Sequence, residues 1–422
     1  MASTYLSRTP ASAGNRKTFT FSGWFKRSAL GASNRIFDVG TGLGDGDRFL
    51  IQFYSTGDTL AVMGGATNWR ITSQVFRDVS AWYHIVVAVD TTQATASDRI
   101  KVYVNGSQIT SFGTSNDPSL NFDLGTNSTS LHTIGSSTAP GVYYDGFMAH
   151  VHLTDGTAYD ASAFGQTDAT SGIWKPKISP SVTYGTNGFF LKFGNAGSLG
   201  TDSSGNGNNF TVNGSGTQTL DTPSNVFATL NGISGYGTFS NGNLKYTTTT
   251  TDGEWSTSTL SISTGGKWYC EAKMISVTGG AQYHIGISNI NSQNFTYRVL
   301  YRGDGAIYVG GSQTDTFSSY TTNDIIGMAY DASNRGISFY KNGNLEGTVT
   351  APALPAGGDY FFGCPSISGG NTYVSEWNFG NGYFGTTAVA TPESDSAGIG
   401  KFEYSVPSGY YALCTKNIAT YG

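Results

Sequence analysis

Bond-breaking chemistry in this chain would most simply come from two carboxyl groups held close together. Hydrolysis of a glycosidic bond uses two such groups about 5 to 9.5 Å apart, and a strand can supply them from residues two or four apart on one face. The sequence has six glutamates, and no two lie within four residues of each other. Asp45 and Asp47 have a suitable spacing, but they lie in a glycine-rich stretch that is typical of a loop. We therefore predict no catalytic residues and a protein that is not an enzyme.

A second pattern places oxygen-bearing side chains at alternate positions, as a calcium-binding loop does. Asp202, Ser204, Asn206 and Asn208 have this spacing. Asn213 stands at the twelfth position, where an EF-hand loop has a bidentate glutamate, so the EF-hand pattern fails. The stretch favours a solvated turn and no cofactor, with Ca²⁺ as the alternative. The candidate ligands for Ca²⁺ are Asp45, Asp47, Asp202 and Asn206.

Histidine and cysteine are too sparse to indicate a metal centre. His150 and His152 are two residues apart on a predicted strand, but a zinc site needs three or four ligands, and no others are evident. Packed histidines are therefore favoured. The three cysteines, Cys270, Cys364 and Cys414, cannot all pair within one chain, and their spacing matches neither a zinc site nor a disulfide framework. We expect a buried thiol at Cys270 and a chain that folds in a cytosol.

Aromatic side chains that flank predicted loops are the main candidates for binding. They could stack on sugars or fill a partner interface, and packing inside the protein is the alternative for each of them. Two arginines stand out because only 12% of the residues are charged, and arginine is enriched at strong interfaces. The candidate binding residues are Trp69, Tyr143, Tyr144, Tyr297, Arg298, Tyr301, Arg302 and Tyr320.

The composition excludes several classes of protein. Glycine accounts for 58 of 422 residues and disfavours helix, while aromatic residues reach 14%. A net charge of -5 provides no electrostatic footprint for nucleic acid. The longest apolar runs have the length of a strand, so we expect neither a signal peptide nor insertion in a membrane.

Alternating patterns predict the strands that must hold the candidate residues. Residues 18–25 alternate between phenylalanine and polar side chains, which indicates a half-buried strand. Residues 85–89 are apolar on both faces, which suggests a central strand covered by a second sheet. An apolar strand, an aspartate, a turn, an aromatic strand and Asn-Gly follow one another twice, ending at Gly106 and at Gly343. The expected helix is limited to a turn or two near 161–166.

This repetition predicts two domains that share one kind of β-sandwich. Glycine, asparagine, serine and threonine crowd residues 194–242, where we expect the boundary. The predicted parts are a first sandwich at 1–180, a connecting strand and Gly/Asn/Ser-rich linker at 181–224, a second sandwich at 225–390, and an aromatic C-terminal tail at 391–422.

Several motifs resemble known families. The first 160 residues or so resemble a laminin-G-type, concanavalin A-like jelly roll, through Phe19–Lys26, Trp82–Val87, Val102–Gly106 and Tyr144–Val151. Residues from about 225 to 385 resemble a SPRY domain, through Trp268–Ala272, His284–Ile287, Asp324–Asp331 and Ile337–Gly343. The tandem order, the joining stretch 165–189 and the ending Pro407–Thr415 resemble virion proteins of tailed bacteriophages. We therefore expect an all-β fold of two tandem concanavalin A-like jelly-roll β-sandwiches with a short C-terminal tail.

The resemblance to phage proteins implies a structural or host-attachment role on a particle. We expect a protein that assembles in the host cytoplasm and lies on the virion surface, as a trimeric tail fibre or receptor-binding protein. Its expected partners are a host cell-surface glycan or protein and other virion proteins. In SPRY relatives peptides bind at loops on one face of the sandwich, where Tyr297, Arg298, Tyr301 and Arg302 fall. The alternatives are a capsid decoration or head-fibre subunit and, with less support, a polysaccharide depolymerase.

Overall fold

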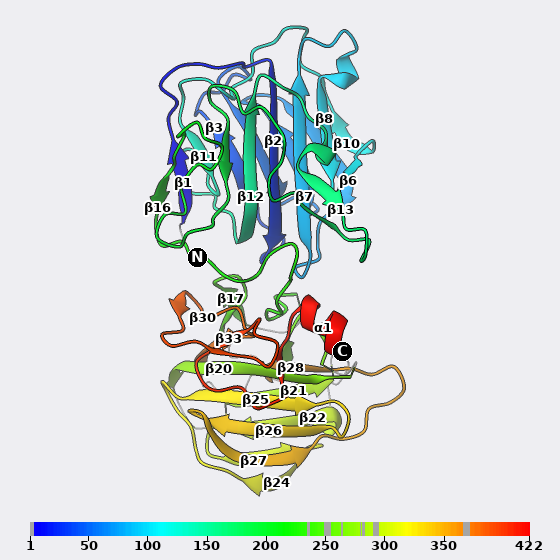
Figure 1. Cartoon of the computed structure of the whole chain (residues 1–422), viewed down its shortest axis with the longest axis vertical. Coiled ribbons are helices and arrows are strands. Elements are labelled where there is room, and N and C mark those ends of the chain that lie inside the picture. The colour runs from blue at the N-terminus through cyan, green and yellow to red at the C-terminus, as the bar shows by residue number, and fades with distance from the viewer. Residues whose placement is uncertain are drawn as a thin grey trace. The chain divides into compact units, whose positions relative to one another are not determined.

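The chain forms two compact units, Met1–Gln218 and Thr219–Gly422 (Figure 1). The computed structural model describes residues 4–233, 237–248, 255–262, 265–278, 280, 283–289, 295–365 and 372–422, without the side chains of 255, 295, 364 and 365. The division after Gln218 lies inside the stretch rich in glycine and asparagine. No helix among the described residues is long and apolar enough to cross a membrane.

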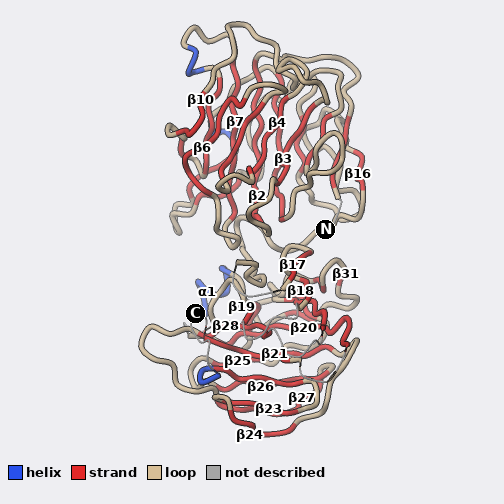
Figure 2. The backbone as a smooth tube through the Cα atoms, turned by 180° about the vertical axis from the view of Figure 1, so that it is seen from behind, coloured by secondary structure: helices blue, strands red, loops and turns tan. Residues whose placement is uncertain are grey.

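The described part of the first unit is built on two large antiparallel sheets. Figure 1 has the six-stranded sheet nearer the viewer, and Figure 2 views the same unit from behind. The eight-stranded sheet has the order β10 (Phe112–Ser115), β6 (Asn68–Val75), β5 (Thr59–Met63), β4 (Phe49–Tyr54), β3 (Asn34–Val39), β11 (His132–Ile134), β1 (Tyr5–Arg8), β16 (Thr211–Asn213). The six-stranded sheet has the order β15 (Phe189–Leu191), β12 (Gly146–Asp155), β2 (Thr18–Arg27), β7 (Trp82–Asp90), β8 (Ile100–Val104), β9 (Ser107–Gln108).

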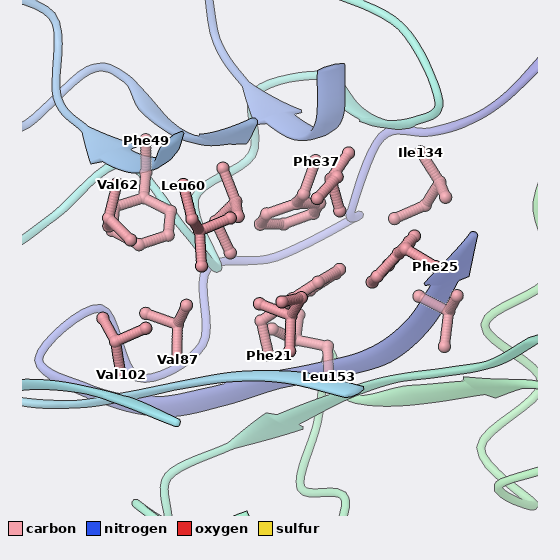
Figure 3. Close-up of a cluster of buried hydrophobic side chains, with 14 of the residues drawn as sticks. Phe21, Phe25, Phe37, Phe49, Leu60, Val62, Val87, Val102, Ile134 and Leu153 are labelled. Atoms are coloured by element: carbon pink, nitrogen blue, oxygen red, sulfur yellow. The ribbon is translucent and has the colours of Figure 1, made fainter. Parts of the chain in front are cut away.

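The core of the first unit lies between these sheets. Figure 3 shows aromatic and aliphatic side chains from both sheets pointing toward one another. Each is at most 1% exposed and contributes roughly 1.5–3 kcal/mol through removal of its apolar surface from water. The labelled side chains are Phe21, Phe25, Val87, Val102 and Leu153 from the six-stranded sheet, and Phe37, Phe49, Leu60, Val62 and Ile134 from the eight-stranded sheet.

The alternation along β2 is confirmed. Phe19, Phe21 and Phe25 belong to the core, whereas Trp24 lies on the outer face and stacks on His84 at 4.6 Å. The adjacent strand β7 is buried on both faces as expected, but a second sheet covers only one of them.

The outer face of β7 is covered by the chain that follows β12. Val86 packs there against Ala161 and Phe164. This cover contains the 3₁₀ turn η2 (Ala161–Ala163), where a short helix was expected, and the ribbon of β13 (Gly165–Thr167) and β14 (Trp174–Pro176). We call residues 156–188 the covering segment.

Both Asn-Gly pairs form the predicted hairpin turns. Asn105 and Gly106 have φ of 48° and 85° and join β8 to β9, while Asn342 and Gly343 have φ of 48° and 82°. Positive φ at both positions is the requirement of a type I′ turn, which asparagine and glycine tolerate best. The second pair joins β26 (Gly336–Lys341) to β27 (Asn344–Thr350).

The second unit repeats the two-sheet plan over its described residues. Tyr301 packs on Phe339 at 5.3 Å and Tyr330 on Tyr360 at 5.8 Å, each pair joining the two sheets. One sheet has the order β17 (Thr238–Ser240), β18 (Lys245–Thr247), β29 (Thr372–Asn378), β20 (Lys267–Thr278), β25 (Ile325–Asp331), β26, β27. The other has the order β19 (Trp255–Thr257), β28 (Tyr360–Pro365), β21 (His284–Asn289), β22 (Arg298–Arg302), β23 (Ala306–Val309), β24 (Ser312–Thr316).

The segments predicted as linker and tail are folded into the two units. Within 181–224, strand β15 pairs with β12 and β16 pairs with β1, so both belong to the first unit. The tail 391–422 forms the ribbon of β32 (Glu393–Ser394) and β33 (Lys401–Phe402), strand β34 (Tyr411–Ala412) and helix α1 (Thr415–Tyr421). Phe402 packs edge-on against Tyr269 of β20 at 4.9 Å. Helix α1 was not predicted.

Candidate binding surface

Five of the eight candidate binding side chains are buried, so their expected role in surface contacts was wrong. Each is at most 8% exposed, and a side chain enclosed to this degree cannot stack on a sugar or a partner. Tyr143, Tyr297 and Arg302 are partly exposed. The buried five are Trp69, Tyr144, Arg298, Tyr301 and Tyr320.

The hydroxyl groups of the buried tyrosines in the second unit are bonded to the backbone. Tyr320 Oη donates to the Tyr301 carbonyl at 2.8 Å, and Tyr301 Oη donates to the Ser318 carbonyl. The two rings meet edge-to-face at 4.8 Å. Burial raises the pKa of Tyr301, because the charged form would lose its hydration. These tyrosines therefore stabilise the sandwich and its loop.

Arg302 is exposed enough to bind a partner but is already paired. Its Nε donates to Asp304 Oδ1 at 2.8 Å and its Nη2 to Asp304 Oδ2 at 2.5 Å. The guanidinium also lies 5.2 Å from the ring centre of Tyr308. A ligand at this position would have to compete with a bidentate ion pair.

Asp45, the first of the candidate calcium ligands, is engaged in local hydrogen bonds through its carboxylate. Asp45 accepts from the backbone of Ala66 and Thr67, both at 2.9 Å, and from Thr67 Oγ1 at 2.6 Å. Asp47 is exposed, and its own N–H donates to the Gly44 carbonyl. The Asp45 carboxylate thus ties two loops together.

The second calcium candidate is a hydrogen-bonded turn. Asp202 accepts from the backbone N–H groups of Phe190, Ser204 and Asn208, each at 2.8 Å. The side-chain N–H₂ of Asn206 donates to the carbonyls of Gly185 and Gly188. The amide therefore directs its N–H₂ group, and not its oxygen, toward these carbonyls. Over the described residues, no three side chains of histidine, cysteine, aspartate or glutamate are grouped so that they could hold a metal ion.

The cysteines that the structure describes are consistent with buried thiols. Cys270 and Cys414 are both free and buried, as expected for Cys270 in a strand. Burial raises the pKa of the Cys270 thiol well above its ordinary value. The side chain of Cys364 lies outside the described residues.

Histidines 84 and 152 hold the covering segment on the six-stranded sheet. The indole N–H of Trp174 donates to His84 Nδ1 at 3.0 Å, and because an indole can only donate, His84 Nε2 carries the proton that it donates to Ser22 Oγ at 2.9 Å. His152 Nδ1 lies 3.0 Å from Tyr184 Oη, and its ring stacks on Phe190 at 3.9 Å. These histidines are packed, as the sequence favoured.

We expect acid to release the covering segment. Burial lowers the pKa of His84 to about 3 and the pKa of His152 well below its ordinary value, and the neighbouring His150 lowers both further. The unfolded chain, with histidine pKa values of about 6.5, therefore binds more protons than the folded chain between about pH 6.5 and 4. The free energy of unfolding falls over this range by up to about 1.4 kcal/mol per pH unit for each such histidine.

Amide hydrogen exchange of residues 159–176, corrected for the intrinsic effect of pH, measures this release. Protection is expected to be constant above about pH 6.5 and to fall toward pH 4. His84→Gln keeps a hydrogen-bond acceptor for Trp174 and removes one titrating group. The free energy of opening that exchange measures should therefore depend less steeply on pH in this variant, by an amount that corresponds to uptake of about one proton fewer. An unchanged slope in His84→Gln would show that other groups drive the release.

Glu271 has the kind of pKa expected of a catalytic acid, but its surroundings indicate a structural role. Burial raises its pKa to about 7, although hydrogen bonds from the backbone N–H groups of Glu403 (2.9 Å) and Tyr404 (3.0 Å) lower it in part. Tyr269 Oη donates to the same carboxylate at 3.3 Å. The carboxylate therefore attaches the tail to β20.

A polar cluster that the sequence analysis missed lies on the outer face of the eight-stranded sheet. Phe37, Ile51 and Val62 of β3, β4 and β5 point into the core, so the residues that alternate with them face outward. We call this cluster the Arg35 surface, and Figure 2 views the first unit from its side. Its members are Arg35, Asp38, Arg48, Gln52 and Met63.

On the Arg35 surface, Asp38 is hydrogen-bonded to Arg48 but not to Arg35. Asp38 accepts two hydrogen bonds from Arg48, at 3.2 Å from Nε and 2.9 Å from Nη2. Arg35 Nη1 is 3.4 Å from the same carboxylate, without the geometry of a hydrogen bond. Burial lowers the pKa of Arg35, and the nearby charge of Arg48 lowers it further, while Asp38 raises it. Asp38 is thus shared between two arginines.

Comparison with known proteins finds a family-level similarity in the first unit. Residues 2–162 match the family model described as the concanavalin A-like lectin/glucanases superfamily. The first part of this chain is therefore similar to this superfamily. This match and the antiparallel sheets confirm the all-β prediction. No curated protein sequence matches the chain.

Similar solved structures resemble the chain only in part. The SPRY domain of human HERC1 is 21% identical over 32% of this chain and 87% of its own, with a TM-score of 0.29. A putative carbohydrate binding protein from Bacteroides ovatus is 17% identical over 50% of this chain and 58% of its own, with a TM-score of 0.29. The heptameric SAP-like pentraxin of Limulus polyphemus is 15% identical over 50% of this chain and 89% of its own, with a TM-score of 0.30.

Proposed function

We propose that this chain is a non-enzymatic surface protein of a tailed-bacteriophage virion, a tail fibre or receptor-binding protein that binds a glycan on the host cell. The observation that carries the binding role is the match of residues 2–162 to a superfamily named for lectins and glucanases. The resemblance of the tandem order and the C-terminal motif to phage virion proteins supports the location on a particle.

The acidic side chains favour a lectin over a glucanase. Glycoside hydrolysis needs two carboxyl groups that can approach one bond. In the described residues Glu271 is enclosed by the tail, and Asp45 is held by a neighbouring loop. A binding role needs no such pair.

Binding and adsorption assays test this function. The purified full-length chain is expected to bind host cells and their surface polysaccharide, and antibody against it is expected to block adsorption of the phage. Absence of binding together with unimpaired adsorption would exclude the receptor-binding role. Release of reducing ends from the polysaccharide would instead indicate a depolymerase.

The assembly state requires a separate measurement. We propose a homotrimer in contact with other virion proteins, since fibres and receptor-binding proteins commonly have three-fold symmetry. Quantitative mass spectrometry of particles should give the low copy number of a tail appendage. A copy number on the scale of the capsid would favour the alternative of a head decoration or head fibre. In this alternative an assembly interface formed by the tail would gain no contact from Phe402, which is buried.

A further inference from the structure

The carboxyl group of Glu271 lies between strand β20 and the tail without a positive charge beside it. Glu271 is fully enclosed, with 0% of its surface exposed. Among the residues that the structure describes, no lysine, arginine or histidine acts on this group, whereas Glu403 of the tail adds a charge of the same sign. A buried carboxylate that lacks a cation is costly. The enclosed position therefore favours the neutral form of Glu271.

The hydrogen bonds of Glu271 leave room for a proton on the carboxyl group. Oε1 accepts from the Tyr404 N–H at 3.0 Å and from Tyr269 Oη at 3.3 Å. Oε2 accepts only from the Glu403 N–H, at 2.9 Å. Two carboxylate oxygens offer about four acceptor positions, two on each oxygen. A proton can therefore occupy the open position on Oε2 while both backbone contacts to the tail are kept.

The phenols around Glu271 stay protonated while it titrates. Burial raises the pKa of Tyr269 well above its ordinary value, and burial also raises the pKa of Tyr404 and of Tyr340. The residues opposite Glu271 on β25 and β29 are Gly327 and Asn378, which do not titrate. The titratable and charged groups on the surrounding elements are Tyr269 and Lys273 of β20, Tyr340 of β26, and Glu403 and Tyr404 of the tail.

We propose that the tail is a pH-sensitive latch, which lies on β20 while the Glu271 carboxyl group is protonated and is released when this group loses its proton. Release lets water reach the carboxylate and provides the hydration that the enclosed position lacks. It also exposes Phe402 and Ala412, which are buried in one apolar cluster with Tyr269. The latch adds a conformational change to the proposed surface protein and does not depend on which ligand that protein binds.

The direction of the pH response follows from the proton that the docked state holds. Burial raises the pKa of Glu271 from 4.5 to about 7 while the tail is docked, and release returns the hydrated group to its ordinary value. The docked state therefore binds more protons than the released state between these two values. Docking is strongest at the acid end of the range, weakens by up to about tenfold per pH unit as the pH rises, and is constant above the range. The covering segment of the first unit responds in the opposite direction.

Amide hydrogen exchange of the full-length chain, corrected for the intrinsic effect of pH, tests the latch between about pH 5 and 8.5. Protection of the tail amides at 395–418 is expected to fall as the pH rises to about 7 and then to level off. Strand β25, which pairs with β26 independently of the tail, should keep its protection. Constant protection of the tail, or a loss toward acid, would overturn the proposal. A parallel loss in β25 would overturn it as well, because the whole sandwich would then respond.

Two substitutions test whether Glu271 is the group that responds. Glu271→Gln stays neutral and keeps an acceptor oxygen, so its tail should be as protected at about pH 8.5 as the native tail is at about pH 5. Glu376→Gln is the matched control, because Glu376 of β29 is 8% exposed and already pairs with Lys245 at 3.6 Å. It should keep the native response. Release of the tail at every pH in Glu271→Gln, or loss of the response in both variants, would overturn the assignment to Glu271.

Tyr269→Phe keeps the test decisive if Glu271→Gln does not fold. The hydroxyl of Tyr269 donates to Glu271, and this hydrogen bond lowers the pKa of the carboxyl group. Its removal disfavours the charged form, so the pH at which the loss of tail protection levels off should rise by roughly one unit. An unchanged or lower value would contradict the proposal.

Discussion

Replacing Asp58 by asparagine is expected to lower the free energy of unfolding of the first unit by about 3–5 kcal/mol, since it removes the partner of a buried charge. Arg27 is fully buried, and its Nη2 donates to Asp58 Oδ1 at 2.9 Å. Its Nη1 donates to the Phe76 carbonyl at 2.6 Å, so the guanidinium cannot turn toward water. The backbone of Asp58 has φ of 56°, which asparagine tolerates. The effect should therefore come from the lost charge and from the loss of one acceptor oxygen, because Asp58 also accepts from the Gly31 N–H at 2.8 Å and from Arg77 Nε at 3.3 Å.

A surface pair provides the control. Asp98→Asn removes the partner of Lys101, and the side chains of that pair are 45% and 35% exposed. Exposed pairs contribute about 0–1 kcal/mol, so this variant should unfold nearly as the native chain does. Chemical unfolding of both variants, followed by hydrogen exchange in β2 and β7, measures the two effects in the first unit. Similar losses in both variants would show that the Asp58 pair gains little from burial.

Much of the sandwich could be predicted because its signals are local. The alternation of Phe19, Phe21 and Phe25 with polar residues places one face of β2 in the core regardless of which strand lies beside it. Asn105-Gly106 and Asn342-Gly343 determine their own turns through φ values that few other residues adopt. A two-sheet architecture follows from such strands, since each must bury one face.

The binding residues could not be predicted from the same signals. An aromatic residue near a predicted loop can be buried in a core or exposed to a partner. Which of the two occurs depends on where the strand that carries the residue ends. Tyr301 lies in β22 opposite Ile285 and packs on Phe339 from the other sheet. Its burial therefore depends on how strands that are far apart in the sequence pair and pack. Residue type carried no information on that register.

The Arg35 surface was missed for a related reason. Its residues belong to separate strands, and a bulge between Arg35 and Phe37 shifts the pairing with β4 so that Arg35 faces Gln52. A weak signal was present, since Arg35, Asp38 and Gln52 are polar residues in strands whose other members are mainly apolar. Polar residues at alternate positions usually face water, and only the structure shows that these are buried.

The tail of the second unit was recognised as aromatic, but its helix was not. Helix α1 has seven residues, includes two threonines, and has no side-chain cap at Cys414. Such a sequence has little helical preference of its own. Its position depends on tertiary contacts, above all on the carboxylate of Asp395.

Asp395→Asn is expected to release the tail from the second unit. Asp395 is 4% exposed and accepts from the N–H groups of Ile399 (2.7 Å), Gly400 (3.1 Å) and Ala412 (2.8 Å) and from Asn417 Nδ2 (2.8 Å). Asparagine has one acceptor oxygen, so its N–H₂ group would face donors. At least one N–H loses its acceptor in either orientation of the amide, at a cost of about 1–3 kcal/mol for each group left unpaired.

The released state would differ from global unfolding because the tail covers only part of the second unit. Strand β34 pairs with β20 at Trp268 and Tyr269, whereas β25 and β26 pair with each other independently of the tail. Hydrogen exchange and limited proteolysis should therefore report lost protection at 395–418 and retained protection in β25. Glu393→Gln, two residues away and exposed, should protect the tail as the native chain does. Uniform loss of protection in Asp395→Asn would show instead that the tail and the sandwich unfold as one cooperative unit.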